Sequence, residues 1–367
     1  MNVVHILKKS VYCIVCITLI FLSLFCAASS NNSEQYLVRL QQELNKFDPI
    51  LKDSVITVSS RYGTFSYSGQ NVTDQSQFYI GSLTKHMTAY MLLSSLKKKY
   101  AHRDLTQMLE QKITLLFPDS TFLKNVNRPW VSEITLLDLL THRSGLSDYI
   151  DYYQSELMQP QALNNPINPV EIMQSVHFNS EKRYHYSNTN YLLLAKLLEE
   201  LEQSSFEDIF HKLIKEPSDM TFSSAPVKDN YFVLKEDSRF SKLVTNLNSE
   251  IFIDMNNAVG TGNIISSSAD LVKWNNYFYA KAESVLRSIM LKNYFKDEDG
   301  NWEHLGLSTE LTSLGPLIAF QGGQDSYHSF LGYLPHYQIS IVILSNNVDD
   351  FEKLMKILDD FLLIKFD

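Results

Sequence analysis

Strand-like segments near both ends of the chain enclose a long middle with helical spacing. Short alternating or apolar runs bounded by turn residues predict strands. These runs cover residues 55–58, 65–67, 317–320, 326–334 and 338–344, and an amphipathic helix is expected from about Asp349 to Leu363. This order predicts that strands from both ends join into one antiparallel sheet, with the middle inserted as a mainly helical lobe.

Helical signals dominate the middle of the chain. Apolar residues recur at helical spacing from Ser82 to Tyr100 and from Asn190 to Leu201. Thr135 and Asp138 form a capping-box pattern ahead of a short apolar run that stops at Gly145. We therefore expect a sheet lobe from about residues 34–81 and 256–367 and a helical lobe from about 82–255, with a site between them.

The first 28 residues have the pattern of an export signal. Lys8 and Lys9 precede an uncharged apolar run from Val11 to Ala28, and small residues follow it. We expect cleavage near Ala28 and a periplasmic or secreted domain spanning 29–367. An uncleaved membrane anchor is the alternative, because about 18 apolar residues lie at the lower limit for crossing a bilayer.

Cysteine positions and net charge exclude several classes of function. All three cysteines, Cys13, Cys16 and Cys26, lie in the expected signal segment, so the mature domain would have no thiol for disulfides, catalysis or zinc. The formal net charge is -9 and argues against nucleic acid as a partner. We expect a small-molecule or short-peptide substrate, no cofactor, and membrane contact only through an uncleaved N-terminal segment.

Ser82 and Lys85 are the first pair of residues that suggests catalysis. A serine hydroxyl is a poor nucleophile until a base takes its proton, and a lysine three residues later on one helix face can do so. Ser82 also follows a turn at Gly81 and opens the expected helix, whose N-terminal amides would stabilise an oxyanion. A helix-capping serine is the alternative interpretation.

The spacing alone is not specific. It recurs twice near the end of the same helix, in Ser94 with Lys97 and in Ser95 with Lys98. Those pairs fall in a charged segment, where we expect side chains on the solvated surface.

The segment around Ser82 and two further segments strengthen its interpretation. The chain resembles the class C β-lactamase and D-alanyl-D-alanine carboxypeptidase-like serine hydrolases in the residues, order and spacing of three segments, Phe78 to Lys85, Leu139 to Leu146 and Tyr186 to Asn188. The likeness extends over roughly residues 54–347. It implies an α/β (α+β) fold of the β-lactamase/transpeptidase type, with an antiparallel sheet flanked by helices.

The resemblance assigns roles to Tyr186 and Asn188. Tyr186-Ser187-Asn188 is the single Tyr-x-Asn in a chain with 20 tyrosines. Tyr186 would serve as general base or acid together with Lys85, and Asn188 would hydrogen-bond the substrate and Lys85. A core tyrosine beside a turn is the plainer interpretation.

A further family segment, Lys/His-x-Gly on a strand opposite the nucleophile, is matched here to Gln321-Gly322-Gly323-Gln324. The cation is replaced by Gln321 in this match. Gly322 and Gly323 would let substrate approach the backbone closely, and the amide of Gln324 would be the second oxyanion donor beside that of Ser82. An ordinary Gly-Gly turn is the alternative.

Other hydrolase patterns lack support. His142 lies at the end of a short capped helix and is expected to be structural, and neither Gly-x-Ser-x-Gly nor His-Glu-x-x-His occurs. The expected function is therefore an exported serine hydrolase that forms an acyl-enzyme with an ester, an amide or a D-amino-acid peptide. A β-lactamase proper and a non-catalytic binding protein on the same fold remain alternatives.

Overall fold

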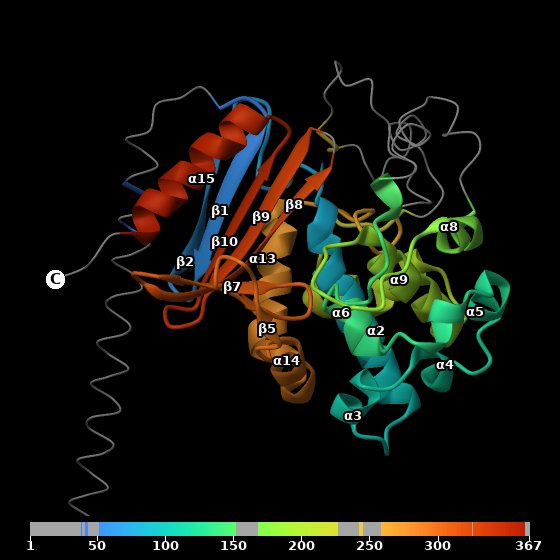
Figure 1. Ribbon diagram of the computed structural model, residues 1–367. Coiled ribbons are helices and arrows are strands. Elements are labelled where there is room, and N and C mark those ends of the chain that lie inside the picture. Colours follow the sequence, from blue (N-terminus) through green and yellow to red (C-terminus); the bar gives the residue numbers. More distant parts are fainter. Residues whose placement is uncertain are drawn as a thin grey trace, which may run out of the picture.

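One antiparallel sheet joins the two ends of the chain. The computed structural model describes residues 38, 41–42, 51–151, 168–226, 242–244, 258–324 and 326–363. Within these ranges the sheet has eight strands in the order β2-β1-β10-β9-β8-β7-β6-β5 (Figure 1). Their bounds are Gly63–Ser68, Ser54–Ser60, Ile339–Ser345, Tyr327–Leu334, Gly315–Gln324, Ser308–Thr312, Trp302–Glu303 and Phe295–Lys296.

The pairing of β1 with β10 confirms that strands from both ends form one sheet. Their register runs from Ser54 opposite Ser345 to Ser59 opposite Ser340. The hairpin of β1 and β2 was also expected from the sequence, whereas the short strands β5, β6 and β7 were not. A second sheet pairs β3 (Phe78–Tyr79) with β4 (Ile265–Ser266) immediately before the nucleophile segment.

Helices cover both faces of the large sheet. The C-terminal helix α15 (Val348–Leu362) lies across one face, and α13 (Ser268–Asn276) lies against the other, on the side of the helical lobe (Figure 1). The other α-helices with described bounds are α2 (Thr84–Lys99), α3 (Leu105–Leu109), α4 (Ile113–Leu116), α5 (Thr121–Val126), α6 (Leu136–Leu140), α8 (Pro169–Ser175), α9 (Asn188–Glu202), α10 (Phe206–Phe210), α11 (Glu216–Ser218) and α14 (Ser284–Met290). Short 3-10 turns cover Gly81–Leu83 (η1) and Pro129–Ser132 (η2), and π-helical turns cover His211–Lys215 (η4) and Tyr277–Lys281 (η6).

The alternation of side chains along β10 creates two hydrophobic cores. Ile341 and Ile343 point toward α15 and belong to the smaller core, while Val342 and Leu344 belong to the larger core that extends into the helices. Every residue of β10 is buried, as expected for a strand with a layer on each face.

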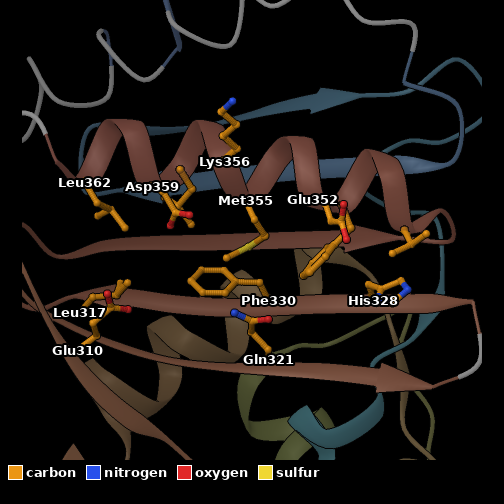
Figure 2. Close-up of a pocket in the computed structure, with 13 residues that line it drawn as sticks. Glu310, Leu317, Gln321, His328, Phe330, Glu352, Met355, Lys356, Asp359 and Leu362 are labelled. Carbon is orange, nitrogen blue, oxygen red and sulfur yellow. The ribbon is translucent and has the colours of Figure 1, made fainter. Parts of the chain in front are cut away.

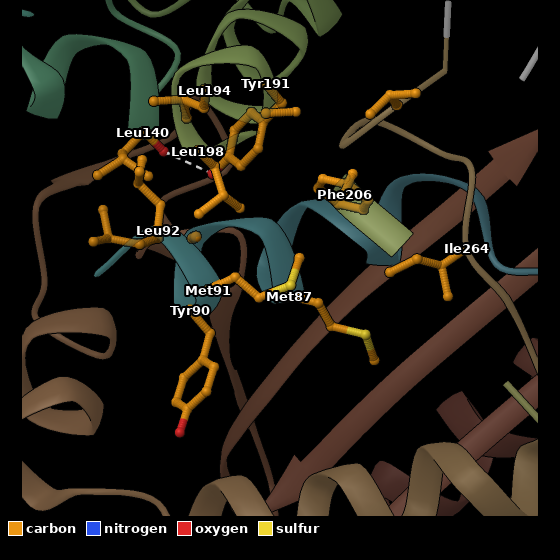
Figure 3. Packing of buried hydrophobic residues seen from close by; sticks show 14 of the residues in the cluster. Met87, Tyr90, Met91, Leu92, Leu140, Tyr191, Leu194, Leu198, Phe206 and Ile264 are labelled. Atoms are coloured by element: carbon orange, nitrogen blue, oxygen red, sulfur yellow. Dashed lines mark hydrogen bonds between the residues drawn. The ribbon is translucent and has the colours of Figure 1, made fainter. Parts of the chain in front are cut away.

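The larger core fixes α2 against α9. Met87 and Met91 of α2 pack in a cluster with Tyr191 and Leu194 of α9 (Figure 3). The Tyr191 hydroxyl donates a 3.0 Å hydrogen bond to the Leu140 carbonyl at the end of α6 (Figure 3). This packing holds the first turns of α2 and α9 in a fixed relation, and both turns carry predicted site residues.

Most predicted helices are present near their expected bounds. The helix expected from Ser82 begins as η1 and continues as α2, and the capping box at Thr135 makes both of its hydrogen bonds. The expected signal segment and the three cysteines lie outside the described residues. Before residue 51 the structure describes only Val38, Gln41 and Gln42, and all three are helical. No described helix combines the length and apolar character needed to cross a membrane.

Candidate active site

Ser82 and Lys85 lie together at the start of the α2 segment. Gly81 has φ +50°, a left-handed conformation suited to glycine, and turns the chain from β3 into η1. The fully buried Lys85 ammonium donates to Ser82 Oγ at 3.0 Å and to Asn188 Oδ1 at 2.8 Å. Its third bond, of 2.9 Å, goes to the carbonyl of Thr261. Lys85 therefore links the nucleophile to two distant segments of the chain.

The environment of Lys85 favours proton exchange near neutral pH. Burial lowers the pKa of Lys85 from 10.5 to about 7, and the carboxylate of Asp148 acts in the opposite direction. A lysine with this pKa is substantially neutral at pH 7 and can accept a proton from the hydroxyl beside it.

Tyr186 lies at the other side of the nucleophile. Its hydroxyl donates a 2.7 Å hydrogen bond to Ser82 Oγ, and its ring centroid is 5.0 Å from Lys85 Nζ. Burial raises the pKa of Tyr186 well above its usual range, although the hydrogen bond to Ser82 opposes this. The phenol therefore remains protonated at neutral pH and acts as a donor in this arrangement.

His142 packs beneath Tyr186 instead of contacting Ser82. The two rings stack with centroids 4.4 Å apart and an interplanar angle of 26°. His142 Nδ1 accepts a 3.1 Å hydrogen bond from the Ser187 amide. Burial and the charge of Lys85 lower the pKa of His142 to about 3, so this imidazole stays neutral and supports the tyrosine ring.

Asn188 connects Lys85 to a carboxylate that the sequence analysis missed. The backbone amide and the side-chain Nδ2 of Asn188 donate to Asp148 Oδ2 at 3.1 and 2.7 Å. Asp148 belongs to the loop that follows α6 and is 9% exposed. The chain has 41 acidic residues, and nothing in the sequence position of Asp148 separates it from the rest.

Gly322 brings strand β8 into contact with the nucleophile turn. A Cβ at Gly322 would lie 2.3 Å from the Ile80 carbonyl and 2.9 Å from the Ser82 amide nitrogen. The peptide of Gly323 is also close, since a Cβ at Gly81 would lie 2.9 to 3.0 Å from it. The glycine pair is therefore part of a strand that presses on the nucleophile segment, and the interpretation as an ordinary turn is wrong.

Gln321 lies on the opposite face of the sheet from Ser82. It is paired with Phe330 of β9 and lines a groove of about 490 Å³ beneath α15, together with Phe330 and Met355 (Figure 2). Side chains alternate between the faces of a strand, so Gly322 and Gln321 cannot point the same way. The structure therefore corrects the placement of Gln321 as a substrate-binding residue near Ser82.

Phe320 points to the same face of β8 as Gly322, the face toward Ser82, which we call the catalytic face. Its side chain packs against the larger core on the side of the helices. When the match to the family segment Lys/His-x-Gly is shifted by one residue, Gly322 is its glycine and Phe320 stands at the position of the cation. An apolar ring therefore occupies that position in this chain.

Gln324 also lies on the catalytic face. Its side-chain oxygen is 2.7 Å from where a Cβ at Gly262 would be, next to the Thr261 carbonyl that accepts from Lys85. The role of the Gln324 backbone amide as second oxyanion donor remains a prediction, because the peptide lying against Gly81 is that of Gly323.

The two other Ser-x-x-Lys pairs differ from the expectation in part. Ser95 is buried rather than solvated, whereas Lys98 is exposed and Lys97 pairs with Glu283.

Across the described residues, no group of three His, Cys, Asp or Glu side chains is arranged to hold a metal ion.

Comparisons with known proteins agree with this geometry. The model of the Beta-lactamase family matches residues 55–361, so the chain belongs to this family. The D-amino acid amidase of Ochrobactrum anthropi has a similar structure, with a TM-score of 0.66 at 20% identity, over 85% of this chain and 95% of that chain.

Two curated relatives carry hydrolase names. The unguisins hydrolase of Aspergillus campestris is 23% identical over 80% of this chain and 57% of its own length. The teichoic acid D-alanine hydrolase of Staphylococcus aureus is 28% identical over 46% of this chain and 38% of its own length. The chain thus spans only part of these relatives.

Proposed function

We propose that the chain is a serine hydrolase that cleaves an ester or amide bond through an acyl-enzyme on Ser82. The observation that carries this proposal is the position of Ser82 Oγ, 3.0 Å from Lys85 Nζ and 2.7 Å from the Tyr186 hydroxyl. A base and an acid that both reach one hydroxyl are the groups that nucleophilic catalysis needs.

In the acylation step, neutral Lys85 accepts the proton of Ser82 while Oγ forms a bond to the substrate carbonyl carbon. The backbone amide of Ser82 donates to the resulting oxyanion. Tyr186 then gives its proton to the leaving oxygen or nitrogen as the bond to carbon breaks, and Lys85 returns a proton to Tyr186. The products of this step are the acyl-enzyme and a neutral alcohol or amine.

In the deacylation step, water takes the place of the leaving group. Tyr186 and Lys85 together remove a proton from water as its oxygen attacks the acyl carbon, and the proton returns to Ser82 Oγ. The serine and both proton carriers are thereby restored.

The substrates we propose are uncharged esters and amides, including derivatives of D-amino acids. Phe320 supplies no positive charge on the catalytic face of β8, and Gln321 faces away, so a substrate carboxylate would lack a charge-assisted bond from this strand. The similarity to a D-amino acid amidase and to a teichoic acid D-alanine hydrolase supports an acyl group of this kind. We rank efficient β-lactamase activity lower for the same reason.

We further propose that the domain acts outside the cytoplasm, in the periplasm or as a secreted protein. The support for this is the sequence alone, in which Lys8 and Lys9 precede an apolar run that ends in small residues. Comparison of the N-terminal residue of the exported protein with Met1 tests the proposal, and an intact N-terminus would favour a membrane anchor instead.

Labelling by a fluorophosphonate tests the catalytic proposal. The parent should be modified at Ser82, and Ser82→Ala should abolish both labelling and turnover. The stability cost should be about 1–3 kcal/mol, because Lys85 and Tyr186 lose a hydrogen-bond partner, whereas no helix cap is lost. Ser94→Ala is the matched control, because Ser94 has the same spacing to a lysine in the same helix and should leave labelling unchanged. Labelling that persists in folded Ser82→Ala would refute the mechanism.

A panel of nitrocefin, a short-chain nitrophenyl ester, a D-amino acid amide and a D-Ala-D-Ala peptide then identifies the substrate. We expect kcat/KM to be highest for the ester or the amide. Strong preference for nitrocefin would contradict the proposed substrate class while leaving the acyl-enzyme mechanism intact.

A further inference from the structure

The orientation of the Asn188 carboxamide decides whether it can help Lys85. Its oxygen accepts the 2.8 Å hydrogen bond from Lys85 Nζ. If the amide were rotated by 180°, its NH₂ group would face the lysine, and two donors would oppose each other in a buried site. Something must therefore hold the oxygen toward Lys85.

Asp148 provides that constraint. Its Oδ2 accepts both from Asn188 Nδ2 at 2.7 Å and from the Asn188 backbone amide at 3.1 Å. Its Oδ1 accepts from the Ile150 amide at 3.0 Å, which fixes the carboxylate itself. A carboxylate only accepts hydrogen bonds, so the Asn188 NH₂ must point to Asp148 and the oxygen must point to Lys85.

We propose that Asp148 is a positioning residue of this active site, which orients Asn188 and supplies the negative charge that stabilises protonated Lys85 during turnover. This inference rests on the proposed function of Lys85 as the proton acceptor. It assigns to Asp148 a role that acts through Asn188, without contact with the substrate.

The charge of Asp148 is well placed for this role. Among the described residues, the other titratable groups that face Lys85 are Tyr186, Tyr191 and His142. Burial raises the pKa of both tyrosines and lowers that of His142, so all three are neutral at pH 7. No described residue forms an ion pair with Asp148, and its charge acts on both proton carriers: it favours the Lys85 ammonium and helps to keep the Tyr186 phenol protonated.

The interposed amide also limits the strength of the interaction. A direct ion pair would raise the pKa of Lys85 and keep it protonated, which would remove the base. With Asn188 between the two charges, burial still lowers the pKa of Lys85 to about 7 despite the opposing effect of Asp148. Lys85 can then be neutral before the reaction and stabilised as the ammonium once it has accepted a proton.

The test measures the titration of Lys85 directly, by NMR of the protein labelled at the lysine ε-carbon, with the signal assigned through Lys85→Arg. Asp148→Asn removes the charge at nearly constant volume. We expect the Lys85 midpoint to fall by about half a pH unit or more, because a nearby negative charge favours the protonated form. Turnover is not needed for this readout, so failure of the proposed activity would not obscure it.

Asp270→Asn is the matched control. Asp270 is also a buried carboxylate that accepts from two backbone amides, those of Thr221 and Phe222, and it does not act on Lys85. Its replacement should leave the Lys85 midpoint unchanged. An unchanged midpoint in folded Asp148→Asn would overturn the inference, as would an equal shift in both variants.

The pH profile of kcat/KM gives a second readout. In Asp148→Asn its acidic limb should move to lower pH by the same amount as the NMR midpoint, and Asp270→Asn should keep the parental limb. If Asp148→Asn does not fold, Asp148→Ser replaces it, since a serine hydroxyl can still accept from Asn188. A parental acidic limb in either folded Asp148 variant would contradict the proposal.

Discussion

The hydroxyl of Tyr186 lies 2.7 Å from the Oγ of Ser82, although the two residues are 104 positions apart in the chain. Ser82 is held by the turn before α2, and Tyr186 by the loop before α9. The packing of α2 against α9 in the larger core brings the two together. Their contact depends on tertiary structure, and it determines how the proton of the nucleophile can move.

Replacing Tyr186 by phenylalanine should lower kcat on the order of a hundredfold or more, the usual contribution of a positioned acid or base. The ring would still stack on His142, so the fold should be retained. Tyr184→Phe is the control, because Tyr184 lies two residues earlier and its ring packs on Phe295 and edge-on to His142, whereas Tyr186 donates to Ser82 Oγ. Steady-state rates within about twofold of the parent for Tyr186→Phe would make Tyr186 a packing residue.

The acidic limb of the kcat/KM profile should have its midpoint near pH 7. Lys85 has a pKa of about 7, lowered by burial, so it is protonated below this pH and cannot accept the serine proton. Activity should therefore rise as pH increases through 7 and stay high above it, up to the range where Tyr186 would lose its proton. A flat profile between pH 5 and 8 would exclude Lys85 as the base.

Gly322→Ala should destabilise the protein by about 1–3 kcal/mol, the usual cost of forcing extra atoms into a packed site. The new Cβ would lie 2.3 Å from the Ile80 carbonyl, and relief would require β8 to move away from the nucleophile turn. Gly323→Ala should unfold like the parent, because a Cβ there meets nothing within 4 Å. Thermal unfolding of the two variants makes the comparison, and equal losses would contradict the close approach.

Gln321→Lys should change neither ester nor nitrocefin turnover, because the new ammonium would enter the groove beneath α15 (Figure 2). Phe320→Lys places the charge on the catalytic face and should raise the ratio of nitrocefin to ester kcat/KM. Both variants add the same charge at neighbouring positions, so only the face of the strand differs. A gain in nitrocefin turnover with Gln321→Lys alone would show that Gln321 reaches the site.

The sequence predicted the parts of this protein that depend on local pattern. Helical spacing located α2 and α9, Thr135 and Asp138 formed the predicted capping box, and alternating runs located the principal strands. Two-residue strands such as β5 and β6 were missed, because so short a segment carries no readable period. Their pairing comes from neighbours in the sheet.

Within the active site, local pattern predicted the positions of Ser82 and Lys85 correctly, whereas it failed for Gln321. The first two lie three residues apart on one helical turn, so the sequence alone fixed their proximity. The strand segment was located correctly, yet a shift of one residue moves every side chain to the other face. The pairing of β8 with β7 and β9 sets that register, and it turns Gly322 toward the Ser82 segment.

Asp148 marks what only the tertiary structure could decide. Its influence on Lys85 depends on the loop after α6 reaching the start of α9, where it meets Asn188. Burial, which gives Lys85 its low pKa, likewise results from the packing of segments that are distant in the chain. The sequence determined which groups were present and which of them share a helix turn, whereas the protonation and orientation of these groups depend on long-range contacts that local patterns do not encode.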